Sequence, residues 1–279
     1  MPGITPTGTF RAQPSPAEVL LREGRPDDAL QALTGQVRAD PSNAAARVFL
    51  FQLLALCGQW ERARMQLEAA VRLDPGNAME GAAWSALLEA ESTRLAVFAG
   101  ERLPTVIGEP SPWLPPLLEA LRLDARGEHA AAGRLRAQAF EAAPATPGRI
   151  DDVAFAWCAD GDTRFGPCLE LVLQGGYGWA PFERIAALQF EPPASLADTL
   201  WAPVLVTWRN GGQAHGYVPV RYPHSEAHAD VALRLGRASD WSQLGEDTWI
   251  GHGQRMLATD GGEHPLLELR SIEFDCDDG

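Results

Sequence analysis

Residues 47–75, RVFLFQLLALCGQWERARMQLEAAVRLDP, predict two helices joined by a turn. Gly58 ends the apolar first helix, because glycine readily adopts the left-handed backbone conformation that closes helices. Pro75 follows the second helix and cannot continue it. Ala63 is expected where the two helices cross, since a small side chain lets them pack closely. The stretch therefore describes one helical hairpin.

The punctuation of this hairpin recurs, with a glycine followed 17 residues later by a proline. The three pairs are Gly24 with Pro41, Gly58 with Pro75, and Gly127 with Pro144. The first two pairs are 34 residues apart, a period typical of tetratricopeptide repeats, whose stacked hairpins present an inner face to peptides. After a tail over residues 1–14, we expect residues 15–143 to form about seven helices in a repeat array. Such an array either binds a partner or supports another domain.

The pattern changes after PATPG at residues 144–148, where short apolar runs such as LELVL and PVLVTW alternate with turn signals. Asn210-Gly211-Gly212 and Asp260-Gly261-Gly262 each predict a strand hairpin, the second one joining RMLAT to LLEL. The stretch SEAHADVALRLGRASDW is partly helical in pattern. We therefore predict an α+β protein in which residues 144–279 form a separate, mostly antiparallel, acidic sheet domain.

Charge excludes several classes of function. The net charge is −14, and residues 147–279 carry 9 Arg against 20 acids. An acidic surface repels phosphate backbones, so nucleic acid is not expected as a partner and a basic protein surface is favoured. The chain has no lysine, which excludes P-loop, kinase and Schiff-base chemistry. We expect neither ATP nor GTP hydrolysis.

The cysteines and the amino terminus indicate the compartment. Cys57, Cys158, Cys168 and Cys276 show no CxxC spacing, and residues 1–16 lack the basic start and apolar core of an export signal. No run approaches the ~18 apolar residues that a membrane span requires. Reduced thiols and a cytoplasmic location are expected.

Candidate sites for metal or acid–base chemistry are weak. His224 and His228 would share a helix face, but Ser225 stands where a zincin has glutamate. Asp160 and Asp162 begin like a calcium loop and then depart from it. Asp151 and Asp152 would complete a carboxylate cluster only if a cleft joined them. We expect no catalytic residue, metal or cofactor, and keep open a metal-dependent hydrolase using Asp160, Asp162, His224 and His228.

The tryptophans predict core packing more than binding. Trp157, Trp179, Trp201 and Trp208 lie in or beside strand-like runs, where large aromatic side chains fill small cores. Trp84 and Trp113 flank a proline-rich spacer at residues 100–112. These two either fill the core or anchor a partner.

Several stretches resemble the ImpE/TagJ proteins, also called SciE-type virulence proteins, which are accessory components of bacterial type VI secretion. The matching stretches, which run from about residue 15 to 275, are FLFQLLALCGQWERA, VFAGERLPTVIGEP, LRAQAFEAAPATPG, FAWCADGDTRFGP, YGWAPFERI, RYPHSEA and GQRMLATDGGEHPLLELRSIEF. His224 departs from the small residue expected before Ser225 and Glu226, which affects one loop.

The resemblance implies an adaptor and not an enzyme, while a generic tetratricopeptide scaffold outside secretion stays open as an alternative. Family members are associated with the amino-terminal helix of the small, TssB-like sheath subunit and with the ClpV unfoldase that dismantles contracted sheaths. An amphipathic helix can lay its apolar face in a groove. If the hairpins stack as repeats, the first helix of each hairpin would expose an apolar strip to such a partner helix, and we call it the partner strip. The expected contacts are Val48, Gln52, Leu56, Leu117 and Leu121, with Trp84 beside them unless Trp84's helix or the acidic domain covers the strip.

Overall fold

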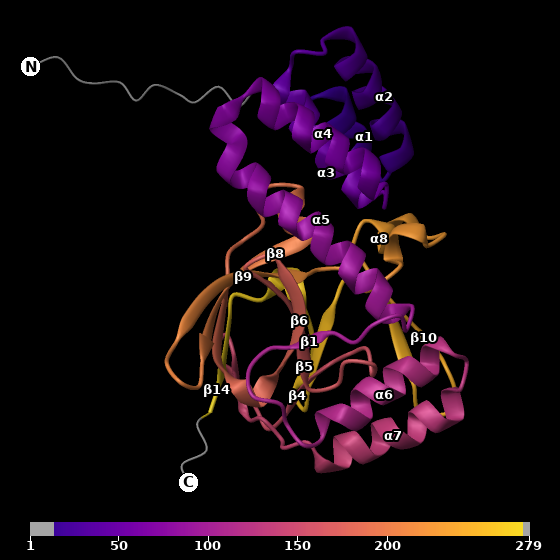
Figure 1. Ribbon diagram of the computed structural model, residues 1–279, viewed down its shortest axis with the longest axis vertical. Helices are drawn as coiled ribbons and strands as arrows, with labels where there is room; N and C mark the ends of the chain where they lie inside the picture. Colours follow the sequence, from indigo (N-terminus) through magenta and orange to yellow (C-terminus); the bar gives the residue numbers. More distant parts are fainter. Residues whose placement is uncertain (1–13, 276–279) are drawn as a thin grey trace, which may run out of the picture.

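The computed structural model describes residues 14–275. Two helical hairpins lie at one end of the molecule and a curled sheet lies below them (Figure 1). The hairpins consist of α1 (Pro16–Arg22) with α2 (Pro26–Ala39), and α3 (Ala44–Leu56) with α4 (Trp60–Leu73). The predicted helices are confirmed. Gly24 and Gly58, with φ of 75° and 68°, close the first helix of each hairpin in the left-handed conformation.

The third copy of the repeat frame also folds as a hairpin, of α6 (Leu114–Ala125) and α7 (His129–Ala142), with Gly127 at φ 78°. It does not stack on the other two. The 21-residue α5 (Ala78–Phe98) runs from the repeat end down the sheet, and the spacer then leads to α6 at the opposite end (Figure 1). The break in the period at the spacer therefore separates the third hairpin from the first two, because α5 carries the chain past the next stacking position.

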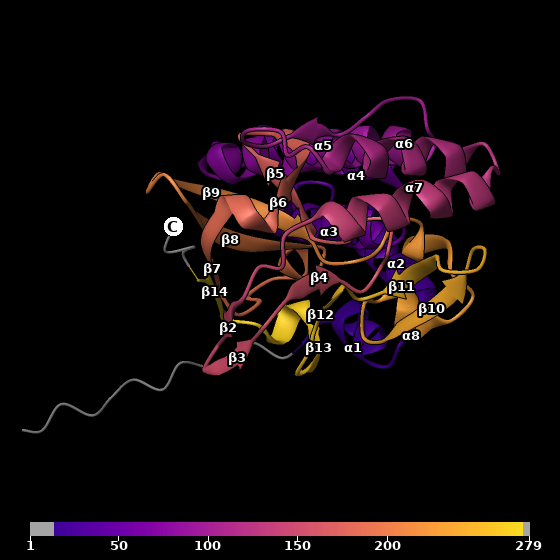
Figure 2. The same cartoon turned by 90° about the horizontal axis from the view of Figure 1, so that it is seen from below.

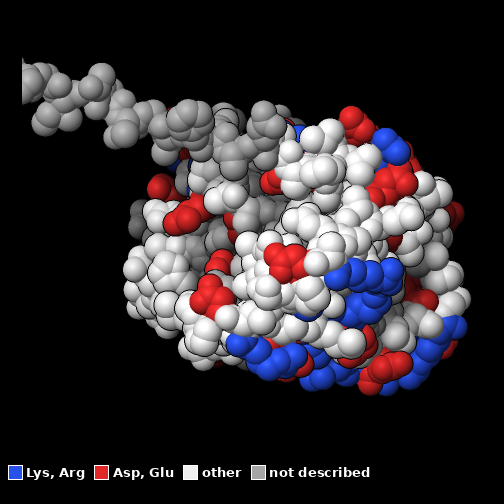
Figure 3. All heavy atoms as spheres, turned by 90° about the horizontal axis from the view of Figure 1, so that it is seen from above, with Lys and Arg blue, Asp and Glu red and all other residues white. Residues whose placement is uncertain are grey.

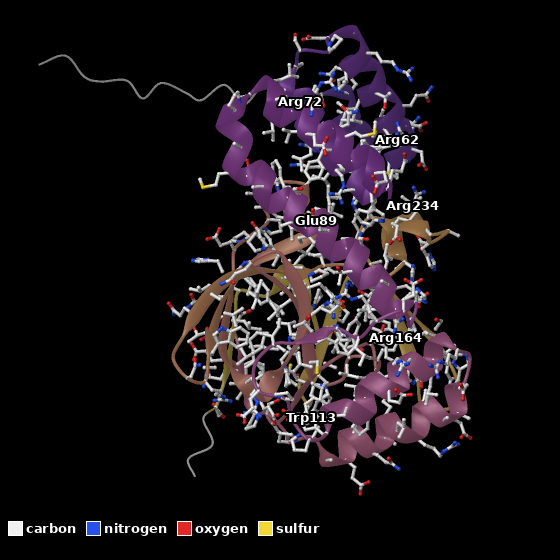
Figure 4. All side chains as sticks on the ribbon, viewed as in Figure 1. Arg62, Arg72, Glu89, Trp113, Arg164 and Arg234 are labelled. Carbon is white, nitrogen blue, oxygen red and sulfur yellow. The ribbon has the colours of Figure 1, made fainter. Side chains whose placement is uncertain are left out.

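The spacer, residues 100–112, extends the sheet. It contains the short strand β1 (Thr105–Val106), which pairs in parallel with β6. The end of the spacer is held by Glu183, whose carboxylate accepts hydrogen bonds from Ser111 and from Trp113 Nε1, the latter at 3.3 Å. Trp113 is 4 % exposed and is a core residue. Figure 4 labels it at the lower end of the molecule.

The main sheet has nine strands in the order β1-β6-β5-β9-β8-β7-β14-β2-β3, all antiparallel except the β1–β6 pair. It curls around a smaller sheet, β13-β12-β4 (Figure 2). A third pair, β10–β11, stands apart. The strands after β1 are β2 (Gly148–Ile150), β3 (Val153–Phe155), β4 (Cys158–Asp160), β5 (Cys168–Leu173), β6 (Gly176–Pro181), β7 (Ile185–Phe190), β8 (Trp201–Trp208), β9 (Gln213–Pro219), β10 (Ser239–Gln243), β11 (Trp249–Gly253), β12 (Met256–Thr259), β13 (Gly262–Pro265) and β14 (Ser271–Phe274).

The α+β class and the mostly antiparallel sheet are confirmed. The turn at residues 210–212 joins β8 to β9 as predicted. The turn at residues 260–262 joins β12 to β13, so its second strand is GEHP and not LLEL. Leu266–Glu268 forms a 3-10 turn. The partly helical stretch contains α8 (Val231–Arg234) and a 3-10 turn at Ser225–Ala227.

Both faces of the sheet are buried, as β5 illustrates. Its alternate residues Cys168 and Val172 belong to one core with side chains of α1–α6, whereas Leu169 and Leu171 belong to a second core with β12 and β14. Successive side chains of a strand point to opposite faces. Although helix gives way to strand near residue 144, the helical core continues onto the sheet. The boundary at residue 144 stays a prediction about independent domains.

Arginines of the sheet half, by which we mean residues 144–275, also contact the first two hairpins. Arg237 donates hydrogen bonds to Leu21 O at 2.8 Å and Arg22 O at 3.1 Å, at the carboxyl end of α1. Arg221 donates to Leu56 O, 34 residues after Arg22, at 2.9 Å. Unpaired carbonyls and the helix dipole favour cations at these ends. Arg234, labelled in Figure 4, adds an ion pair with Asp27 of α2 at the same junction.

Candidate functional site

The predicted partner strip is not an open surface. Gln52 and Trp84 are each 7 % exposed, and Leu56, Leu117 and Leu121 are buried more deeply. Val48 is half-buried against the same core. The expectation of exposed inner positions was wrong, because α5 and the sheet cover the first helices of the hairpins. Contact of these six residues with a partner stays a prediction.

The histidines and carboxylates considered for a metal do not converge. His224 is exposed and occupies the left-handed region at φ 68°, and the His228 ring lies 5.3 Å from that of His252. Asp160 and Asp162 are buried in ion pairs with arginines. Within residues 14–275, no three His, Cys, Asp or Glu side chains lie close enough to hold a metal ion. Cys276 lies outside the described residues.

A buried network of charges joins α5 to the sheet. Arg94 on α5 donates from Nε and Nη2 to the two carboxylate oxygens of Glu170 on β5, at 2.9 and 2.8 Å. Arg255 donates to Glu170 and to Asp160, and its guanidinium lies 4.6 Å from the ring centre of Phe165. Charges this deep are stable only when paired and hydrogen-bonded. The network positions α5 across the sheet.

The side chains around this network fix its protonation. Burial alone would raise the pKa of Glu170, but Arg94 and Arg255 hold that pKa below its ordinary value. Burial raises the pKa of Asp160 to about 6 against the opposing charge of Arg255. The cavity beside Arg94 and Glu91 has a volume of only about 10 Å³, room for about one water molecule. The network therefore has no space for a substrate.

An open groove of about 520 Å³ lies between the spacer and the β8–β9 hairpin, and we call it the spacer–hairpin groove. Its apolar side chains come from the spacer, β5, β8 and β9: Ile107, Leu173, Trp208 and Ala214. Ile107 is fixed by its backbone N–H, which donates to Trp179 O at 2.8 Å. The turn after Trp208 is closed by its two hydrogen bonds with Gly211 and Gly212. Rigid backbone therefore forms both walls.

Two arginines complete the spacer–hairpin groove. Arg209 is held by its hydrogen bonds to Glu183 O and Phe274 O. Arg184 is less engaged: its ion pairs to Glu109 and Glu183 are both 3.9 Å long, and its buried Nε has no hydrogen-bond partner among the described residues. Glu183 is occupied by the end of the spacer. The Arg184 side chain is 33 % exposed and has no close ion pair among the described residues.

Sequence reasoning did not identify the spacer–hairpin groove. The stretches VFAGERLPTVIGEP and YGWAPFERI contain Ile107 and Arg184, but they were interpreted only as family markers. Their juxtaposition depends on the parallel pairing of β1 with β6, which no local pattern encodes. Of the four strand tryptophans, Trp179 and Trp201 are buried as predicted, Trp208 lines the groove and Trp157 is 42 % exposed. Core packing was therefore the wrong prediction for Trp157.

Surface charge is mixed at the repeat end of the molecule. Seen from above, arginine and acidic side chains are interspersed around a wide uncharged area (Figure 3). No helix within residues 14–275 combines the length and apolar character needed to cross a membrane.

Known protein families match both the helical half and the sheet half of the chain. The model of the family described as ImpE protein matches residues 152–273, and a tetratricopeptide repeat model matches residues 20–90. The repeat match therefore covers the first two hairpins and not the third. A crystal structure of a protein from Vibrio parahaemolyticus superposes with a TM-score of 0.86 at 24 % identity, over 94 % of this chain and 98 % of that one. At that identity the likeness shows the fold alone.

A sequence relative is closer in identity. The type VI secretion system accessory component TagJ of Pseudomonas aeruginosa is 47 % identical over 262 residues, which cover 94 % of this chain and 92 % of that protein. The resemblance seen in the sequence is confirmed. The chain belongs to the ImpE family, together with TagJ.

Proposed function

We propose that this protein is a non-enzymatic accessory component of a type VI secretion system. It binds the amino-terminal helix of the small, TssB-like sheath subunit and assists ClpV-dependent disassembly of the sheath. The observation that carries the proposal is the 47 % identity with TagJ over nearly the full length of both chains. Closed packing of the buried charge network supports a role without turnover.

The sheet half is the favoured docking region. The ImpE family model lies at residues 152–273, within the sheet half, whereas tetratricopeptide repeats occur in proteins of many functions. Seven of the ten residues that line the spacer–hairpin groove fall within residues 152–273. The partner strip on the helices, by contrast, is closed. We therefore assign the sheath helix to the groove.

The chemistry of the groove suits one face of an amphipathic helix. Apolar side chains of the helix would cover Ile107, Leu173 and Trp208. A carboxylate at the edge of that face would pair with Arg184, whose present ion pairs are long. Arginine binds carboxylates through two parallel hydrogen bonds, which fixes orientation as well as affinity. The helix is thus positioned by one charged contact and held by apolar burial.

Binding of a labelled peptide of the sheath subunit's first helix, followed by fluorescence anisotropy, tests this assignment. Ala214→Arg places a long charged side chain in the groove and should weaken binding at least ~10-fold. Gln213→Arg is the matched control, because it adds the same charge to the opposite face of β9 and should leave affinity within about twofold. If wild type and Ala214→Arg bind with equal affinity and have the same circular dichroism, the sheath helix does not bind in the spacer–hairpin groove.

The role in disassembly needs its own measurement. Purified contracted sheaths mixed with ClpV and ATP should disassemble faster when this protein is present, and Ala214→Arg should reduce that acceleration. The Gln213→Arg protein serves again as the control. If this protein leaves the disassembly rate unchanged while its peptide binds normally, the proposed assistance to ClpV is wrong and the docking remains.

A further inference from the structure

A second groove lies at the junction where the last helix gives way to the strands, and its lining differs from that of the spacer–hairpin groove. It lies between the carboxyl end of α7 and β4, has a volume of about 330 Å³, and is here called the α7–β4 groove. The residues used in the argument are Phe140, Thr146, Trp157, Ala159 and Pro167. None of them belongs to the spacer–hairpin groove.

The floor of the α7–β4 groove is rigid. The Phe140 ring lies directly on Gly166, where a Cβ atom would come within 2.2 Å of the ring. Gly166 has φ 55°, and its carbonyl accepts a hydrogen bond from Asp160 N at 2.8 Å. The groove is therefore preformed and an occupant would not have to create it, which lowers the cost of binding.

One polar group in this apolar groove lacks a partner. Thr146 is 6 % exposed, and its Oγ1 is the only side-chain hydroxyl among the buried atoms of residues 14–275 that makes no hydrogen bond. A buried hydroxyl left unpaired costs free energy, which an occupant with a hydrogen-bonding group recovers. A helix already uses its main-chain carbonyls internally, whereas an extended segment has them free. The hydroxyl therefore favours an extended occupant.

Three acidic residues lie beside residues of the groove in the chain or through a hydrogen bond. Glu141 follows Phe140 on α7 and is exposed, and Asp260 accepts a hydrogen bond from Ala156 N, next to Trp157, at 2.7 Å. The backbone N–H of Asp275 donates to Pro147 O at 2.9 Å, and Pro147 directly follows Thr146 in the chain. Arg149, an exposed arginine three residues after Thr146, donates a hydrogen bond to Asp152 O. The local excess of carboxylates favours a basic ligand.

We propose that the α7–β4 groove binds an extended segment of a protein partner, with apolar side chains flanked by arginine or lysine. Trp157, 42 % exposed, stacks on the apolar part. The Thr146 hydroxyl donates to a main-chain carbonyl of the segment, and Glu141 and Asp260 pair with its basic flanks. This site is separate from the one assigned to the sheath helix, so either assignment can fail alone.

The experiment uses the full chain and two short labelled peptides in fluorescence anisotropy. One has a valine–leucine–valine centre between paired arginines, and the other carries glutamates in place of the arginines. The arginine peptide should bind at least ~10-fold more tightly, with an affinity that falls as salt rises. Equal binding of the two peptides, or no binding of either, would overturn the proposal.

Matched variants locate the site. Trp157→Ala should weaken the arginine peptide ~10-fold or more, whereas Trp249→Ala, which removes a tryptophan of similar exposure (44 %) outside the groove, should leave binding unchanged. Thr146→Val should weaken binding about two- to tenfold while the melting temperature stays the same or rises, because the hydroxyl has no partner in the free protein. A fall in melting temperature on Thr146→Val, or equal loss with Trp157→Ala and Trp249→Ala, would contradict the assignment.

Discussion

The partner strip predicted on the helices and the spacer–hairpin groove are both apolar, but only the groove is open. Leu117 and Leu121 of the strip are 0 % and 2 % exposed, whereas the groove between Ile107 and Ala214 has a volume of about 520 Å³. The strip is closed by α5 and the sheet, whose contacts come from distant parts of the chain. An apolar pattern on a repeat helix therefore indicates burial. It indicates a partner site only where no other part of the chain already covers that helix face.

The largest effect should come from placing a charge in the strip. Leu121→Asp buries a carboxylate with no partner and should lower the free energy of unfolding by about 3–5 kcal/mol, as measured by urea denaturation. Ala214→Arg in the groove should change it by less than about 0.5 kcal/mol. A loss below about 1 kcal/mol for Leu121→Asp would mean that the strip is open in solution.

An arginine of the buried core and an arginine of the groove should also differ in how much their loss lowers stability. Arg94→Ala removes a fully buried cation and leaves Glu170 with one arginine fewer, so the expected loss is about 3 kcal/mol or more. Arg184→Ala breaks only two long ion pairs on a partly exposed side chain and should cost less than about 1 kcal/mol. Similar losses for the two variants would show that Arg184 is structural and not available to a ligand.

Contact with the sheet half should also make alanine more destabilising at one of two equivalent turn glycines than at the other. Gly58 and Gly127 have nearly the same φ, so Ala at either position strains the backbone by about 1 kcal/mol. A Cβ at Gly58 would lie 2.5 Å from Glu226 Cγ, whereas a Cβ at Gly127 would have no described residue within 4 Å apart from its two neighbours in the chain. Gly58→Ala should therefore melt at a lower temperature than Gly127→Ala. Equal melting temperatures would mean that the loop carrying Glu226 does not press on the second hairpin.

The sequence determined the parts of the fold that depend on local pattern. The glycine-to-proline frame located the helices of all three hairpins, because left-handed glycines end helices wherever they occur. It could not show that the third hairpin lies apart, since stacking depends on the length and path of α5. Gln52 and Leu121 were misread because a helix facing a groove and a helix facing a core carry the same apolar spacing. The pairing of Arg94 with Glu170 joins residues 76 positions apart, which no local signal reports.

Hydrogen exchange of the protein with and without the sheath-helix peptide tests the central claim most directly, because it reports both regions at once. We expect added protection in the spacer around Ile107 and in the β8–β9 hairpin around Ala214, with α3 and α6 unchanged. Added protection in α3 and α6, without change in the β8–β9 hairpin, would contradict the assignment and return the partner to the helical strip.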